Sequence, residues 1–110
     1  MQYREVASGL EFPEGPVVLP NGDLLVTEIK AGRLTRITAA GEKSVFAVTG
    51  GGPNGAAIGP DGWIYVTQNG GFTWSERPLP DGRMGVYPGL QPPDYRGGAV
   101  QRVSPDGSVV

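Results

Sequence analysis

The sequence contains neither cysteine nor histidine among its 110 residues. Without cysteine there are no disulfides and no thiol chemistry. Without histidine, the commonest general base and the commonest zinc ligand are both missing. A metal ion bound by this chain must therefore be held by oxygen atoms, which favours calcium or magnesium.

Long apolar runs and blocks of positive charge are also missing. No stretch approaches the length of a membrane span, and no N-terminal segment has the pattern of a signal peptide. The formal net charge is -2, which makes nucleic acid an unexpected partner. We therefore expect a cytoplasmic protein that contacts neither a membrane nor nucleic acid.

Glycine and proline, by contrast, are abundant, with 19 and 11 residues. Such a content is compatible with disorder, but the apolar fraction of 38% and an ordered alternation of strand-like stretches argue against it. The length suits one small domain.

A repeated frame organises this domain. The stretch PEGPVVLPNGDLLVT at 13–27 returns, 40 residues later, as PNGAAIGPDGWIYVT at 53–67. The glycines, the turn before each second strand and the closing Val-Thr coincide, whereas Glu14 is replaced by Asn54. A period near 40 with four strands per unit is typical of a β-propeller blade.

Short strands separated by glycine-containing turns predict an all-β chain of antiparallel sheets. The first four-stranded blade is expected within 14–48 and the second within 53–110, with a long insert near 69–97 and a truncated last strand. An N-terminal strand within 1–8 precedes them. The expected strands are 3–7, 15–19, 23–28, 33–38, 44–47, 55–59, 63–67, 99–104 and one beginning at 108, with 15–19 and 55–59 as adjacent innermost strands.

Two blades fall short of a closed propeller, which needs roughly four to eight. Open blades leave sheet edges uncovered, and the sequence stops just after a turn, inside an expected strand. We therefore interpret the chain as a fragment of a longer propeller, in preference to a two-bladed chain that closes a ring as a homotrimer. The complete protein is expected to be monomeric.

The motifs EFPEGPVVLPNGDLLVTEIKAGRLTRI and GGPNGAAIGPDGWIYVTQNGG together resemble the senescence marker protein/gluconolactonase/luciferin-regenerating enzyme superfamily, which includes regucalcin. Members are six-bladed propellers with one divalent cation, usually calcium, in the central channel, and many hydrolyse lactones. The resemblance implies a metal-dependent hydrolase of small lactones or related esters, of which this chain is an N-terminal piece, inactive in isolation. The alternative is a non-enzymatic propeller module that binds a ligand or a protein.

The resemblance also implies two site residues. Glu14 matches the first metal ligand of the family, and Asn54 matches an asparagine that contacts the metal, or its bound water, and the substrate. The repeat supports this pairing, because equivalent positions of successive blades lie at similar depth around one channel. The resemblance places the catalytic aspartate outside this chain. Gly52 and Gly55 stand where gluconolactonase-like members tend to have arginine and aspartate, which argues against a sugar-acid lactone but not against hydrolysis.

Other roles for these residues remain open. Glu14 also suits a surface turn, and Asn54 before glycine also suits a left-handed turn. In the insert, the aromatic residues suit either a substrate mouth or packing of the loop onto the blade. These aromatic residues are Trp74, Tyr87 and Tyr95, while Asn69, Asp61 and Asp106 are predicted to shape turns and the repeated Arg36 and Arg102 to be structural.

Overall fold

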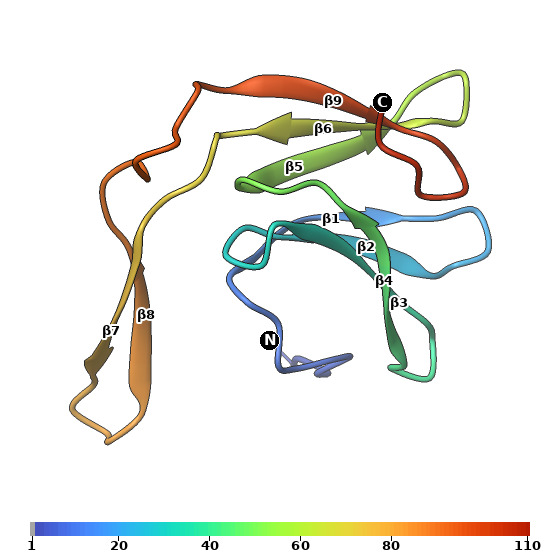
Figure 1. Cartoon of the computed structure of the whole chain (residues 1–110). Helices are drawn as coiled ribbons and strands as arrows, with labels where there is room; N and C mark the ends of the chain where they lie inside the picture. Colours follow the sequence, from blue (N-terminus) through green and yellow to red (C-terminus); the bar gives the residue numbers. More distant parts are fainter. Residues whose placement is uncertain (1) are drawn as a thin grey trace.

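The computed structural model describes residues 2–110, which form nine β-strands and no helix (Figure 1). Four consecutive strands make one antiparallel sheet in the order β1-β2-β3-β4, three make a second in the order β5-β6-β9, and β7-β8 is a separate hairpin. Across this described range, no segment has the helical length and apolarity that crossing a membrane would require. The strands are β1 Pro13–Val18, β2 Leu24–Glu28, β3 Arg33–Ile37, β4 Lys43–Val48, β5 Pro53–Ile58, β6 Ile64–Gln68, β7 Trp74–Pro78, β8 Met84–Pro88 and β9 Ala99–Val103.

The prediction of an all-β chain with antiparallel sheets is confirmed. Seven of the expected strands form within about two residues of their expected bounds, and no helix interrupts 15–67. The insert holds a structured element that the sequence did not predict, the hairpin β7-β8, whose strands pair from Trp74 with Pro88 to Pro78 with Met84.

The expected N-terminal strand at 3–7 is wrong, since these residues belong to no strand. A strand requires a neighbouring strand to complete its backbone hydrogen bonds, and no other described strand pairs with this segment. A side chain holds it instead, with Lys43 Nζ donating to the carbonyl of Ser8. At the other end, the strand expected from Ser108 is reduced to a single bridge between Val103 and Val109.

The two sheets pack on each other where β1 meets β5, so the expected adjacency of these two strands is confirmed. At the contact, Gly15 has φ 51° and faces Gly55 so closely that a Cβ on Gly15 would lie 2.9 Å from the Cα of Gly55. Only glycine fits such a backbone approach. Both sheets contribute to one buried apolar cluster, formed by Leu25, Leu34, Ala47, Ile64, Val66 and Val103.

The turns of the two sheets use the predicted acidic residues. Asp61 Oδ1 accepts a hydrogen bond of 3.0 Å from the backbone N–H of Trp63, and Asp106 Oδ1 accepts one of 3.1 Å from that of Ser108. The hydrogen bonds of Asp106 with Ser104 and Ser108 hold the pKa of its carboxyl below the usual value. These aspartates shape hairpins, as predicted.

The repeated arginines are also structural. Arg36 Nε lies 2.9 Å from Oδ2 of Asp23, and Arg102 Nη2 lies 3.1 Å from Oδ2 of Asp61. The Arg102 guanidinium also stacks over the Trp63 ring, 3.7 Å from its centroid. In each sheet, then, an arginine from the third strand is fastened to the turn between the first two.

Candidate functional site

Glu14 lies near the start of β1 with its side chain exposed. Its backbone pairs with Thr27 on β2, and the register of β1 then shifts before Val17. The carboxylate accepts one hydrogen bond, of 3.2 Å, from the backbone N–H of Gly15. Most of its oxygen lone pairs therefore remain free for a ligand.

Asn54 occupies the matching place on β5 and is also exposed. The register between β5 and β6 shifts between Pro53 and Gly55, so that Asn54 falls at an irregularity in the ladder. Irregularities of this kind redirect a side chain and are common beside active sites. In the structure, the residue that changes between the two repeats thus sits at a backbone irregularity in both strands.

A buried threonine joins these two positions. Thr27 is 0% exposed, and its Oγ1 donates a 2.8 Å hydrogen bond to the backbone carbonyl of Glu14. The carbonyl of Asn54 lies 3.4 Å from the same oxygen. The structure therefore brings both predicted site residues to one end of the inner strands, around a single hydroxyl. Sequence reasoning did not assign Thr27 a role, although the repeated Val-Thr at the end of each frame was a signal for it.

The side-chain oxygen atoms of Glu14 and Asn54 suit a hard cation but do not complete a metal site. A carboxylate and an amide oxygen are the ligand types that calcium takes, usually six to eight at a time. Within residues 2–110 no group of three or more His, Cys, Asp or Glu side chains gathers to hold a metal. Glu14 and Asn54 can therefore supply only part of a coordination sphere.

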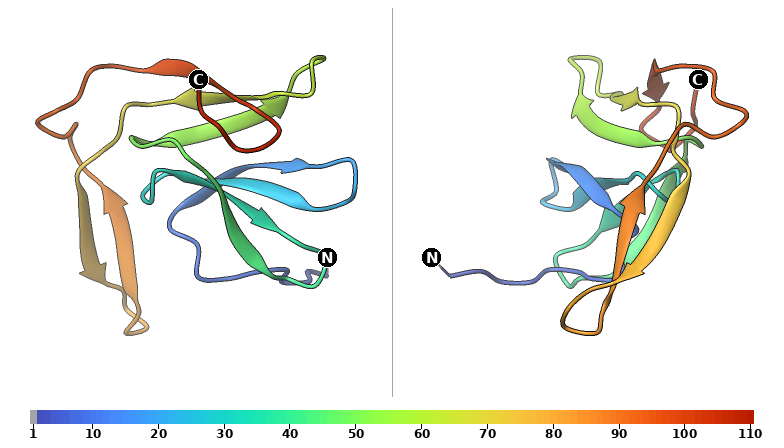
Figure 2. Two further views of the ribbon diagram at one scale, coloured as in Figure 1. Left: turned by 45° about the vertical axis from the view of Figure 1, so that its right-hand side comes forward. Right: turned by 90° about the vertical axis from the view of Figure 1, so that its left-hand side faces the viewer.

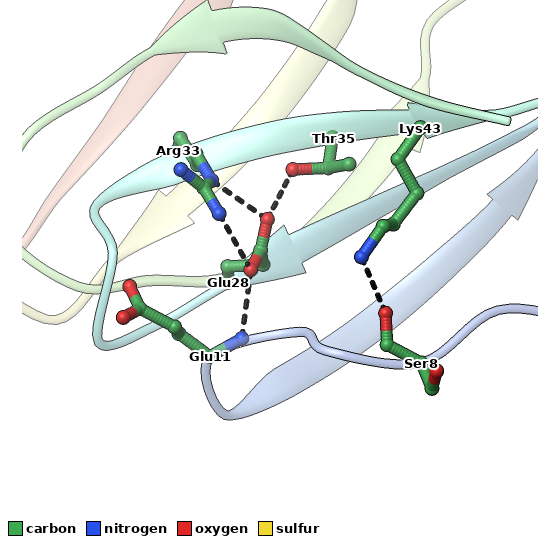
Figure 3. A network of polar contacts seen from close by, with 6 residues as sticks. All are labelled: Ser8, Glu11, Glu28, Arg33, Thr35 and Lys43. Atoms are coloured by element: carbon green, nitrogen blue, oxygen red, sulfur yellow. Dashed lines mark hydrogen bonds and ion pairs between the residues drawn. The ribbon is translucent and has the colours of Figure 1, made fainter.

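Behind the inner strand, the first sheet contains a second acidic residue, Glu28, at the end of β2 (Figure 3). Its side chain is 0% exposed. Arg33 Nε donates to its Oε2 at 2.7 Å, Arg33 Nη2 donates to Oε1 at 3.1 Å, and the Thr35 hydroxyl also donates to Oε2. The backbone N–H of Glu11 completes the set at 2.7 Å from Oε1.

This network keeps Glu28 ionised. Burial opposes ionisation, but the hydrogen bonds from Arg33, Thr35 and the Glu11 backbone, together with the charge of Arg33, outweigh it and lower the pKa of Glu28 to about 2. The carboxylate also raises the pKa of the Arg33 guanidinium. A pocket of about 230 Å³ lies beside the pair. Because every carboxylate oxygen is already engaged, Glu28 acts as a structural anion and leaves no lone pair aimed at a ligand.

Gln68 takes the place of Glu28 in the second sheet. Its Oε1 accepts from the backbone N–H groups of Gly52 and Gly70. Its Nε2 donates to the carbonyl of Gly50 at 2.9 Å and to Oε1 of Gln101 at 3.1 Å. A neutral amide thus fixes the loop that leads into Asn54.

The insert begins against this loop, where the backbone N–H of Asn69 donates a 3.0 Å hydrogen bond to the carbonyl of Gly52. Asn69 shapes a turn, as predicted, because its Oδ1 accepts a 2.8 Å hydrogen bond from the N–H of Gly71. Among the aromatic residues, Tyr87 lies under the guanidinium of Arg77, 4.7 Å from ring centroid to Cζ. Trp74 packs against Phe12 and Phe72, with ring centroids 5.1 Å and 6.0 Å apart.

No protein-family model matches the chain, and no curated protein matches it either. The resemblance to the gluconolactonase-like superfamily stays a prediction.

Proposed function

We propose that this chain is the N-terminal part of a metal-dependent propeller hydrolase of lactones or related esters. Glu14 is its ligand to one divalent cation, calcium, and Asn54 contacts the cation directly or through the water that the cation holds. The observation that carries the proposal is the convergence of both backbones on the buried Thr27 hydroxyl. Two exposed oxygen-bearing side chains thereby start from neighbouring points of the backbone.

The arrangement of the strands supports the propeller part of the proposal. In a propeller blade the first strand is innermost, and the others follow outward in chain order. The order β1-β2-β3-β4 and the contact of β1 with β5 agree with two such blades side by side. On this interpretation Glu14 and Asn54 face one channel at equal depth, and further blades supply the remaining ligands.

The residues at this site have different proposed roles. When bound, the cation supplies Lewis acidity toward a substrate carbonyl and lowers the pKa of its water. Glu14 contributes the negative charge that this segment offers the site. Asn54 contributes a neutral oxygen and an N–H donor, which suits it to orient a substrate oxygen or a water. Thr27 holds the backbone carbonyl of Glu14 by a 2.8 Å hydrogen bond and lies 3.4 Å from that of Asn54.

Calcium titration by calorimetry tests this assignment on the complete protein. We expect Glu14→Gln to weaken calcium binding by at least about tenfold, equivalent to about 1.4 kcal/mol, because a carboxylate ligand is lost. We expect the same variant to abolish lactone hydrolysis. Asn54→Ala is expected to lower turnover while the protein stays folded, since Asn54 is exposed. Glu76→Gln, an exposed carboxylate on β7, is the matched control and should behave as the parent.

A Glu14→Gln variant that binds calcium and hydrolyses lactones like the parent would show that Glu14 is a turn residue. A parent protein that binds calcium but turns over no lactone or ester would favour the non-enzymatic binding module.

A further inference from the structure

The insert between β6 and β9 touches the loops that lead into both predicted site residues. The Trp74 ring lies 5.1 Å from that of Phe12, which is two residues before Glu14. At the second loop, a Cβ on Gly71 would lie 3.4 Å from the Cα of Gly51, close before Asn54. Figure 1 and Figure 2 show the hairpin β7-β8 on the side of the sheets where β1 and β5 begin, standing apart from both sheets.

The polar groups at the base of the insert are already occupied. The Gln68 amide is bound to Gly50, Gly52, Gly70 and Gln101. Asn69 Oδ1 is bound to the N–H of Gly71. The Gln68 side chain therefore ties the insert to the loop, whereas that of Asn69 shapes a turn within the insert, and neither has its full hydrogen-bonding capacity free for the hydroxyl groups of a substrate.

Three aromatic rings, those of Phe12, Phe72 and Trp74, form the accessible part of the contact between the insert and these loops. Phe12 is 37% exposed, and Phe72 and Trp74 are half-buried. The rings meet tilted and edge-on, with interplanar angles of 55° and 84°. Phe12 also has φ 58°, a conformation that is uncommon outside glycine, so its backbone is held in an unusual shape immediately before the site. Partly exposed rings beside a polar site bind flat, apolar groups.

We propose that the rings of Phe12, Phe72 and Trp74 form the substrate-selecting wall of the site and that the substrate is a lactone or ester with an aryl or comparably flat apolar group. This inference rests on the proposed function. In the reaction, the oxygen of water bonds to the carbonyl carbon and the bond from that carbon to the ring oxygen breaks. A proton from the water ends on the departing ring oxygen, giving a hydroxy acid. The wall takes no part in these steps and acts only by binding the apolar group.

The test compares two six-membered lactones that differ by one fused benzene ring, dihydrocoumarin and δ-valerolactone, on the complete calcium-loaded protein. The parent is expected to prefer dihydrocoumarin in kcat/KM. Trp74→Ala should reduce that preference by about tenfold. The loss should come from a lower kcat/KM for dihydrocoumarin, while kcat/KM for δ-valerolactone stays within about twofold of the parent's. Trp74→Phe, which retains a ring against Phe12, should keep most of the preference.

Trp63→Phe is the matched control, because Trp63 lies at the turn between β5 and β6, at the opposite end of the strands. It should leave the preference unchanged. The dihydroquinolinone lactam, an amide analogue that is not hydrolysed, gives a binding readout by calorimetry that should weaken in Trp74→Ala alone.

The outcomes separate the two proposals. If the parent hydrolyses both lactones without preference, or if Trp74→Ala changes both values equally and leaves lactam binding intact, the aromatic wall is overturned and the hydrolase stands. If the parent hydrolyses neither lactone and binds no calcium, the proposed function fails, and the substrate class fails with it.

Discussion

The first and second repeat units perform the same structural task with side chains of different charge. In the first, the ionised Glu28 is held by Arg33 and tethers the backbone N–H of Glu11. In the second, the neutral Gln68 tethers the N–H of Gly52 and bonds to another amide, Gln101. In both units the tethered loop leads into the inner strand that carries a predicted site residue.

This difference shows that the fold needs an acceptor for the loop N–H at this place, and not a charge. A buried ion pair is costly to desolvate and becomes a strong contact only when its geometry is complete. The amide version avoids that cost but offers weaker hydrogen bonds. The Glu28 tether of the first unit should therefore respond to pH, whereas the Gln68 tether of the second should not.

The largest effect is expected from converting the first unit to the second unit's chemistry. Glu28→Gln should lower the free energy of unfolding at pH 7 by about 2–4 kcal/mol, since Arg33 loses its buried anion. For the parent, the folded pKa of Glu28 is about 2, below its ordinary value of 4.5. Its contribution is thus complete above about pH 5 and is lost as pH falls toward 2, by up to about 3 kcal/mol. Urea titrations across this pH range measure both effects.

The control for this prediction is Glu76→Gln, which changes an exposed carboxylate on the hairpin β7-β8. It should retain the parent's pH dependence, whereas Glu28→Gln should flatten the curve between pH 5 and 2. Parallel curves for the parent and Glu28→Gln would mean that Glu28 is not the group that titrates.

The reverse exchange should cost less and depend on pH in the opposite direction. Gln68→Glu places a carboxylate against the carbonyl of Gly50 and Oε1 of Gln101, both of which now accept from the Gln68 amide. We expect a loss of about 1–3 kcal/mol at pH 7, because acceptors then face acceptors without a nearby cation. Protonation restores a donor, so the loss should shrink as pH falls below about 5. Gln91→Glu, at an exposed position, should show neither effect, and equal losses at pH 4 and pH 7 would count against the stated cause.

The smallest effect concerns the threonines that end the two frames. Thr27→Val removes a buried hydroxyl bonded at 2.8 Å to the Glu14 carbonyl and should destabilise by about 1 kcal/mol. Thr67→Val removes an exposed hydroxyl whose contact to the Gly55 carbonyl is 3.4 Å, and should change stability by less than about 0.5 kcal/mol. Thermal unfolding of both variants measures the difference between their losses of stability. Equal destabilisation would contradict the special role of Thr27 between the two inner strands.

The repeat in the sequence was sufficient to predict the strands of both sheets. Turn glycines and alternating apolar residues are local signals, so the bounds of β1 to β6 and β9 could be found without a structure. The N-terminal strand failed because its existence depends on a partner strand, which local sequence does not reveal. The hairpin β7-β8 was missed because proline and glycine dominate its surroundings, β7 is largely exposed and β8 is only half-buried.

Of the candidate site, only the two exposed side chains could be predicted from the sequence. Glu14 and Asn54 stood out because one position changed within a repeated frame. The supporting residues Thr27, Glu28 and Gln68 could not be ranked from sequence, because their roles depend on which loop N–H and carbonyl groups lie next to them in space. The contact between Trp74 and Phe12 joins residues far apart in the chain, for which the sequence contains no pattern.

The close approach of Gly15 and Gly55 has a consequence for redesign. The distance between β1 and β5 is set by these two residues, which have no side chains, and the proposed ligand positions 14 and 54 precede them directly. The side chains proposed to bind the cation and the spacing of the two sheets therefore depend on different residues. An engineer can exchange Asn54 for aspartate to strengthen the charge offered to a cation without repacking the interface, whereas alanine at Gly15 would force the two sheets apart.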